Sequence, residues 1–275
     1  MKVFYRVLLL ILVAVFLFSG WQFLALSKEY EKSSESYSGL EQYVSMQNTP
    51  KQPDSSRETQ TDPGAAAPTD TSAPTETTSP VDDTLWPVVD FEALMEINPD
   101  VVGWIWIPDT EVNYPVMQGT DNDYYLNYTW DGNKSIMGSI FLEHQNSPEL
   151  TDFNTMIYGH NMDNGSMFAS LRYYNDEHYW KQHPYVYLLS DQGVYRYEIF
   201  SFYITEVEGN AYGLGFATDR IKTLFLNEIC RDSAVKTQIR PEITDRILTL
   251  STCSGIGYST RWVVHARLPM IPAEA

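Results

Sequence analysis

Between residues 101 and 268 the sequence is a succession of short runs of β-branched and aromatic residues, separated by Gly, Pro, Asn and Asp. The first two runs, VVGWIWI and VNYPVMQG, flank a Pro108-Asp109 turn and indicate a hairpin or two adjacent strands. Further strands are expected at 138–143, 154–159, 185–190, 194–206, 246–252 and 261–268. Many short strands with few helices favour a mainly β fold, a closed or nearly closed β-barrel.

Helical patterns are scarce in this part of the chain. DFEALMEI predicts a first helix, with Asp90 as its N-cap and Pro99 as its stop. Two helices are expected to interrupt the later strands, a single turn near 167–171 and a longer helix over 218–233. The longer one carries an apolar stripe formed by Ile221, Leu224, Phe225 and Ile229.

An uncharged apolar stretch near the N-terminus determines the compartment. Residues 7–26 follow Lys2 and Arg6 and have about the 20 residues that a helix needs to cross a bilayer. A cleavable signal peptide is the alternative, but the stretch is long for a signal core and lacks an A-x-A site. We therefore expect residues 1–26 to form a cytoplasmic tip and a single-pass anchor, with the rest of the chain outside the cell.

The composition changes after the anchor. Residues 27–84 are rich in Pro, Thr, Ser and acids and contain few large apolar residues, so they cannot bury enough surface to offset their ordering entropy. We expect a disordered extracellular stalk there, and a folded domain over 85–275.

Charge and cysteine content exclude some classes of protein. A net charge of −18 argues against nucleic-acid binding, because an acidic chain repels phosphates. A domain of this size does not need a disulfide, so we expect Cys230 and Cys253 to be free thiols, Cys230 packed on the long helix and unreactive.

The stretch RILTLSTC places a thiol at the end of a predicted strand. Alternation puts Cys253 on the same face as Ile247, Thr249 and Ser251, at the rim of the sheet. The following SGIGYST turn should return Arg261 toward Cys253, where a guanidinium favours a thiolate and can donate to an oxyanion. Cysteine is, however, more often a small buried residue than a nucleophile.

A nearby base would favour nucleophilic chemistry. His160 ends a strand-like run and enters a glycine-bearing loop in MIYGHNMDNG, which predicts an imidazole at the barrel rim. His144 is the reserve, because it also follows a strand. His178 and His183 lie in a polar segment, and His265 is within a strand. A Cys/His pair on rigid strand ends suits acyl transfer, with thiolate attack and protonation of the leaving amine.

Several stretches together resemble class B sortases, in the same order along the chain. They are NPDVVGWIWIPDTEVNYPVMQGTDNDYYLN, GSIFLE, NTMIYGHNMDNGSMFASLRYY and TLSTCSGIGYSTRWVVHARL. The resemblance covers nearly all of residues 85–268, and the helix before the cysteine strand also resembles an insertion of class B.

The resemblance implies an eight-stranded sortase barrel with a few peripheral helices and a membrane-anchored cysteine transpeptidase of Gram-positive bacteria. On this basis Cys253 is the nucleophile, His160 the general acid and Arg261 the residue that holds substrate and stabilises the oxyanion, with Cys and His active as thiolate and imidazolium. Arg267 is expected to be a strand-end or surface cation.

Substrate-lining positions also follow from the resemblance. Asn113, Tyr158 and Ser251 fall where class B members line the cleft, and the backbone N–H of Ser254 is a second oxyanion donor. Family members often carry an acidic residue at that last position, so the resemblance implies no role for the serine side chain.

The implied partners are surface proteins with a C-terminal sorting signal of the NPxT or SPxT kind, cleaved after Thr. The acceptor would be an amine of a cell-wall precursor or, alternatively, a pilin lysine. No spacing of His, Cys and carboxylates suggests a metal site, and no cofactor is implied.

Two other classes remain as alternatives. A papain-like hydrolase would place its cysteine at a helix start, which the strand context disfavours. A non-catalytic, membrane-tethered wall-binding module would explain the anchor and the aromatic β domain without an active site.

Overall fold

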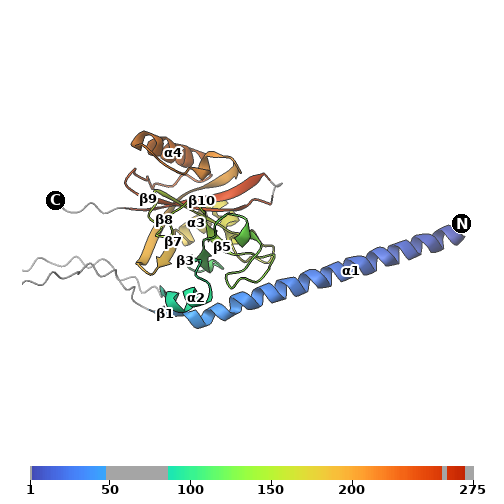
Figure 1. The fold of residues 1–275 in the computed structure, drawn as a ribbon. Helices are drawn as coiled ribbons and strands as arrows, with labels where there is room; N and C mark the ends of the chain where they lie inside the picture. The colour runs from blue at the N-terminus through green and yellow to red at the C-terminus, as the bar shows by residue number, and fades with distance from the viewer. Residues whose placement is uncertain (1, 48–85, 256–258, 270–275) are drawn as a thin grey trace, which may run out of the picture.

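Eight strands form a closed barrel in the computed structural model, which describes residues 2–47, 86–255 and 259–269 (Figure 1). Its wall runs in the order β10-β8-β7-β3-β4-β5-β6-β9. The bounds are β3 (Val101–Trp106), β4 (Asn113–Met117), β5 (Ile140–Leu142), β6 (Asn154–Tyr158), β7 (Tyr185–Ser190), β8 (Gly193–Glu206), β9 (Arg246–Cys253) and β10 (Thr260–Leu268). The predicted barrel and its eight strands are confirmed.

Two parallel pairs distinguish this barrel from a simple up-and-down meander. β4 pairs with β5 and β6 pairs with β9 in parallel, while the other neighbours are antiparallel. A parallel pair needs a crossover between its strands: the β4–β5 connection is a long loop with a short 3-10 helix, and the chain between β6 and β9 contains β7 and β8 of the wall as well as several helices. These connections carry most of the helices and loops around the site.

Side-chain alternation fills the barrel interior with apolar residues. On β9, Leu248 and Leu250 point inward and are fully buried in the main core with Val264 of β10. Ile247 points outward into a separate cluster beneath α4 (Asp219–Asp232). The predicted division of β9 into two faces is confirmed, because the strand period of two holds along its whole length.

Short helices cover the outside of the barrel. They are α2 (Phe91–Ile97), α3 (Glu177–Gln182), α4 and the 3-10 helices η1 (Gly39–Tyr43), η2 (Tyr124–Leu126), η3 (Ala169–Asn175) and η4 (Asn210–Tyr212). The N-cap at Asp90 is confirmed, since its carboxylate accepts from the Ala93 N–H at 3.0 Å. The expectation of only two later helices was wrong: α3 is short and polar, and an Asp176 cap rather than apolar periodicity starts it.

The apolar face of α4 differs from the predicted stripe. Phe225 and Ile229 are buried as expected, and Leu226 is buried with them. Ile221 and Leu224 are instead exposed by 47% and 54%. The helix packs on the barrel through its second half, so its first turn and a half projects into solvent.

The N-terminal segment is attached to the barrel more extensively than its composition suggested. α1 (Lys2–Ser38) is long and apolar enough to cross a membrane, and the side chains from Phe4 to Leu24 are exposed. Beyond α1, β1 (Val44–Gln47) pairs with β2 (Trp86–Val89) in a separate two-stranded sheet. Leu40 is buried in the second apolar cluster on the barrel wall.

This attachment changes the boundary expected for the stalk. Residues from 30 to 47 dock on the barrel, because Tyr30, Tyr37 and Leu40 pack against its apolar clusters. Gln47 and Trp86 lie opposite each other in the β1–β2 ladder, so both ends of the intervening segment are held at one place. The remainder of the predicted stalk, residues 48–85, lies outside the described residues.

A chain of hydrogen bonds on the outer wall holds His265 in its neutral form. Asn154 accepts the Thr249 hydroxyl proton at 2.7 Å, so the Thr249 oxygen accepts from Nδ1–H of His265 at 2.9 Å. Nε2 of His265 then accepts from the Tyr203 hydroxyl at 3.2 Å. Burial lowers the pKa of His265 from 6.5 to about 3.

We predict that this histidine makes the barrel sensitive to acid. The unfolded chain binds a proton near pH 6.5 while folded His265 does not, so stability is lost as the pH falls from about 6.5 toward 3, by up to about 1.4 kcal/mol per pH unit. In His265→Gln, the free energy of unfolding in urea should change less between pH 6.5 and pH 4.5 than it does in the wild-type protein. Equal pH dependence in the two proteins would contradict the assignment.

Candidate active site

Cys253 and Arg261 face each other across the β9–β10 hairpin. The register pairs them directly, with Cys253 the last residue of β9 and Arg261 the second of β10. The thiol is exposed and the arginine half-buried, and Nη1 of Arg261 donates to the Thr260 carbonyl at 3.0 Å. Cross-strand neighbours have Cβ atoms about 4.5–5.5 Å apart, so the hairpin alone brings the cation to the thiol.

Parallel pairing brings His160 to the same rim. Tyr158 lies opposite Ser251 in the β6–β9 ladder, and His160 and Cys253 each follow two residues later. The ladder continues past β6, since the Gly159 N–H donates to the Ser251 carbonyl at 3.2 Å. Adjacent strands lie about 4.8 Å apart, so the pairing brings the backbones of His160 and Cys253 to neighbouring positions at one rim.

Asn161 closes this junction beyond the end of β6. Its side-chain amide donates to the Cys253 carbonyl at 2.9 Å. The bond ties the loop after β6 to the end of β9, and therefore holds the His160 backbone at a fixed place relative to the cysteine.

The imidazole of His160 has a defined orientation. Nε2 lies 2.8 Å from the Leu126 carbonyl oxygen. Because a carbonyl can only accept, Nε2 carries a proton, and Nδ1 is the nitrogen left to exchange a proton with a substrate. Gly159 makes the close approach of this loop feasible: a Cβ there would lie 2.3 Å from Cδ1 of Ile140 and 2.9 Å from Cδ2 of Phe168.

Two tyrosines line the outer wall next to the Cys/Arg pair. The Tyr212 hydroxyl and Ser251 Oγ are 2.9 Å apart, and the ring of Tyr212 stacks with that of Tyr158 at 6.5 Å. Burial raises the pKa of Tyr212; the Ser251 bond and the charge of Arg261 oppose the rise, while Cys253 adds to it. The phenol therefore lies within electrostatic reach of both the thiol and the guanidinium.

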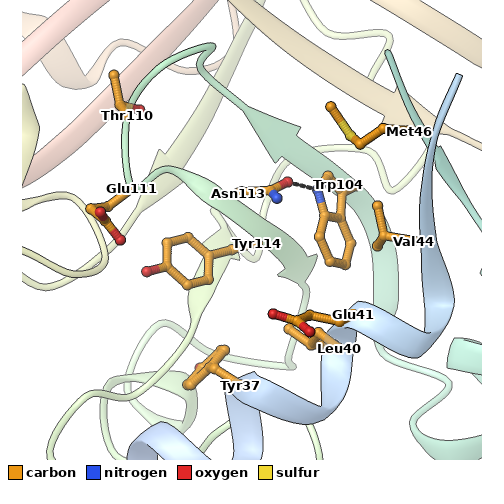
Figure 2. A pocket seen from close by; sticks show the side chains of 10 residues that line it. All are labelled: Tyr37, Leu40, Glu41, Val44, Met46, Trp104, Thr110, Glu111, Asn113 and Tyr114. Carbon is orange, nitrogen blue, oxygen red and sulfur yellow. Dashed lines mark hydrogen bonds between the residues drawn. The ribbon is translucent and has the colours of Figure 1, made fainter. Parts of the chain in front are cut away.

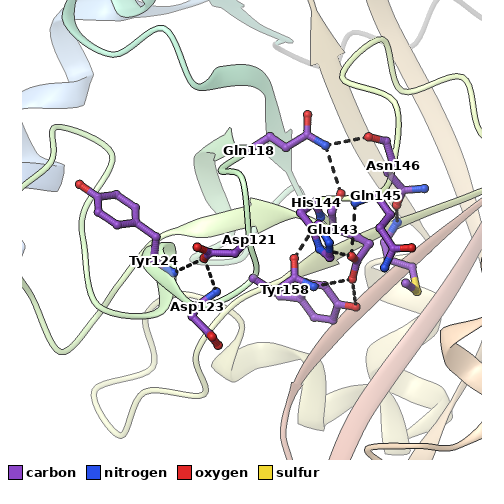
Figure 3. A network of polar contacts seen from close by, with 11 residues as sticks. Gln118, Asp121, Asp123, Tyr124, Glu143, His144, Gln145, Asn146 and Tyr158 are labelled. Atoms are coloured by element: carbon purple, nitrogen blue, oxygen red, sulfur yellow. Dashed lines mark hydrogen bonds and ion pairs between the residues drawn. The ribbon is translucent and has the colours of Figure 1, made fainter.

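A buried carboxylate supports the second tyrosine (Figure 3). Glu143 is 4% exposed and accepts from the Tyr158 hydroxyl at 2.9 Å and from Nδ2 of Asn122 at 2.7 Å. Burial and this charge raise the pKa of Tyr158. Tyr158 thus stays a neutral phenol that is fixed by its own hydrogen bond.

The reserve histidine lies at the other end of β6. Nδ1 of His144 pairs with Glu143 at 2.7 Å (Figure 3). The Glu143 N–H donates to the Met156 carbonyl, which places this part of the chain beside the middle of β6 rather than at its C-terminal end. The register therefore places His160, and not His144, at the rim that carries Cys253.

Two of the predicted substrate-binding residues, Asn113 and Ser254, form hydrogen bonds within the protein itself. Oδ1 of Asn113 accepts from Nε1 of Trp104 at 2.7 Å, in a groove of about 460 Å³ between β3–β4 and the N-terminal segment (Figure 2). β5 and β6 separate this groove from β9 along the wall. The Ser254 N–H donates to the Thr260 carbonyl at 3.1 Å, so it closes the hairpin in this state.

Comparison with known proteins identifies the family. A family model described as Sortase domain matches residues 105–269. Sortase B of Listeria monocytogenes is 35% identical over 246 residues, which are 90% of this chain and 88% of the relative. The chain belongs to the sortase family. Sortase B of Staphylococcus aureus is also 35% identical, over 65% of this chain and 74% of the relative.

Solved sortases agree with the fold. The Staphylococcus aureus sortase B–substrate complex has a TM-score of 0.62 at 34% identity and covers 66% of this chain and 85% of its own. Sortase B from B. anthracis in complex with AAEK1 has a TM-score of 0.59 at 40% identity, over 65% and 83%. The resemblance to class B is confirmed, and this sortase is an enzyme of the cysteine transpeptidase type.

Three elements of this sortase's site escaped the sequence analysis. Tyr212 comes from a turn-rich loop with no distinctive spacing, and the Leu126 carbonyl is a backbone group that no side-chain pattern reveals. Asn161 directly follows the histidine in the YGHN stretch, and this position is the only sequence feature that could have indicated its contact with the end of β9. Among the described residues no cluster of three or more His, Cys, Asp or Glu side chains could hold a metal ion.

The two thiols should differ in reactivity. Cys253 is exposed, whereas Cys230 is half-buried and burial raises its pKa. Because the thiolate is the reactive form, one equivalent of iodoacetamide at neutral pH should alkylate Cys253 and leave Cys230 unmodified. Peptide mass spectrometry measures both sites, with Cys253→Ala as the control. Preferential labelling of Cys230 would contradict the arrangement.

Proposed function

We propose that the enzyme cleaves a C-terminal sorting signal after threonine and transfers the protein to an amine through a thioester on Cys253. The observation that carries the proposal is the convergence of three groups: Arg261 pairs opposite Cys253, and His160 and Cys253 hold matched positions on neighbouring parallel strands. The substrate complex of the Staphylococcus aureus relative supports a peptide substrate.

The first half-reaction follows from these positions. The Cys253 sulfur attacks the threonine carbonyl, an S–C bond forms and the carbonyl oxygen becomes an oxyanion, which Arg261 stabilises by charge and hydrogen bonding. The C–N bond then breaks, and the His160 imidazolium gives its Nδ1 proton to the departing amine. Cys253 retains the protein as a thioester.

The second half-reaction reverses these roles. An amine attacks the thioester carbonyl, His160 removes a proton from the attacking nitrogen, and Cys253 leaves as a thiolate. The new amide joins the protein to the acceptor, which we propose is an amine of the cell-wall precursor. Water in place of the amine would give hydrolysis.

The half-buried wall beside the exposed Cys253 supports this substrate class. Tyr158, Tyr212 and Ser251 form a wall of fixed aromatic and hydroxyl groups next to the reacting atoms, suited to a short extended peptide. We assign Tyr158 and Ser251 to substrate binding on this basis. Asn113 and the Ser254 N–H would act in binding only through rearrangement of their present contacts.

The membrane arrangement is also part of the proposal. The apolar part of α1 would span the bilayer once, with Lys2 and Arg6 inside and the barrel outside, where cell-wall substrates are found. One continuous helix would then provide both the basic cytoplasmic end, with Lys2 and Arg6, and the apolar membrane-spanning part.

Peptide cleavage tests the proposal. We expect the full chain in detergent micelles to cleave one of three quenched fluorescent peptides, with NPQTN, SPKTG or LPETG cores, after Thr. Cys253→Ala should abolish cleavage. His160→Ala should lower kcat/KM by about 10²–10⁴-fold and Arg261→Ala by about 10²–10³-fold, the usual effects of losing a general acid or an oxyanion donor.

Matched variants separate chemistry from general damage. Cys230→Ala, His178→Ala and Arg231→Ala change the same residue types away from the site, and they should retain kcat/KM. A Cys253-linked acyl adduct in the mass spectrum would establish the thioester. Absence of cleavage with all three peptides and with added amines would reject this substrate class and favour the wall-binding alternative.

A further inference from the structure

We propose that one face of α1 positions the active site, acting on His160 through the β4–β5 loop, residues 118–139. We call Ser33, Ser36 and Tyr37 the docking face of α1. The inference rests on the proposed role of His160 as general acid. It makes Tyr37 a positioning residue, 123 positions before the histidine in the chain.

Each residue of the docking face contacts the β4–β5 loop. Ser33 is buried, accepts from the Ser135 hydroxyl at 2.6 Å and donates to the Glu29 carbonyl within α1 at 2.7 Å. The Ser36 carbonyl accepts from Nε1 of Trp130 at 2.9 Å. The Tyr37 hydroxyl donates to the Gly138 carbonyl.

Tyr37 is held firmly in this contact. Its ring packs edge-on against Tyr114 of β4 at 5.5 Å, and burial raises the pKa of its phenol. The hydroxyl also lies 3.4 Å from Ser139 Oγ. The neutral phenol therefore serves as a fixed donor to the loop across the physiological pH range.

Gly138 transmits this contact to Leu126. Its φ of +54° is in the left-handed region, and a Cβ there would lie only 2.7 Å from the Leu126 carbonyl oxygen and 2.6 Å from that of Tyr125. The next residue continues the contact, because the Ser139 N–H donates to the Tyr125 carbonyl at 2.8 Å. The peptide group between Gly138 and Ser139 therefore bonds to Tyr37 on one side and to the Tyr125 carbonyl, next to Leu126, on the other.

The same Leu126 carbonyl accepts from Nε2 of His160 at 2.8 Å. A continuous path therefore links α1 to the imidazole: Tyr37 donates to the Gly138 carbonyl, the N–H of the same peptide group donates to the Tyr125 carbonyl, and the carbonyl of the next residue, Leu126, accepts from His160. Loss of the first of these bonds would let the loop relax, and the ring would no longer be fixed with Nδ1 toward the substrate. Such second-layer bonds commonly control the orientation of a catalytic imidazole.

The end of α1 is secured on its other side as well. β1 pairs with β2 from Val44–Val89 to Gln47–Trp86, and the Asp90 N–H donates to the Tyr43 carbonyl at 2.9 Å. The β4–β5 loop thus holds the docking face, and the β1–β2 sheet holds the chain that follows α1. The helix proposed to cross the membrane and the loop that orients His160 form one continuous packed unit.

Removal of a single hydroxyl tests the proposal. In the full chain in lipid nanodiscs, Tyr37→Phe keeps the ring contact with Tyr114 but removes the donor to Gly138. We expect kcat for peptide cleavage to fall about tenfold with KM unchanged, because orientation rather than substrate affinity is lost. Ser33→Ala should act in the same direction.

Tyr174→Phe is the matched control. The Tyr174 hydroxyl is also buried and donates to a backbone carbonyl, that of His183, at 2.9 Å, but far from the β4–β5 loop. It should lower the melting temperature about as much as Tyr37→Phe and leave kcat unchanged. Equal kcat in the Tyr37→Phe and Tyr174→Phe variants would overturn the proposal.

A second measurement does not depend on turnover. Diethyl pyrocarbonate modification of His160, followed by peptide mass spectrometry, reports how firmly the imidazole is held. The rate should rise in Tyr37→Phe and stay at the wild-type value in Tyr174→Phe. A wild-type enzyme that cleaves no peptide would refute the proposed function, and an unchanged modification rate in Tyr37→Phe would refute the positioning role separately.

Discussion

The parallel ladder between β6 and β9, with Tyr158 opposite Ser251, joins the two halves of the barrel wall and sets the distance between His160 and Cys253. Parallel strands end at the same edge, so two residues that follow matched positions emerge side by side. The antiparallel β9–β10 hairpin then adds Arg261 opposite the thiol. One parallel and one antiparallel pairing therefore assemble all three groups, and the apolar barrel interior keeps the strands in register.

The site is built on the outside of this rigid wall. Glu143, Tyr158, Tyr212 and Ser251 form hydrogen bonds along the outward face, next to an exposed thiol. Preorganised groups of this kind need little rearrangement as charge develops in a reaction. The same outward face, farther along β9 and β10, holds neutral His265 under α4, where burial has an entirely structural effect.

The N-terminal segment connects membrane attachment with the active-site loop. Its residues 27–47 are mostly polar, and their few apolar side chains are too widely spaced to form a core of their own. Tyr37 and Leu40 become buried partners only because the barrel offers Tyr114 and the second apolar cluster. Residues 27–47 belong to α1, η1 and β1, and the rest of the segment expected to form a stalk lies outside the described residues.

Local pattern in the sequence determined much of this protein: the strands and their faces, the Asp90 cap, the N-terminal helix that is apolar and long enough to cross a membrane, and the hairpin that returns Arg261 to Cys253. Each depends on residues close together in the chain. The contacts of Tyr212 with Ser251 and of Leu126 with His160, the buried face of α4 and the docking of Tyr37 were decided only by tertiary structure. They depend on strand order, register and packing between distant segments, because contacts such as Asn161 with Cys253 have no local period or spacing that would encode them.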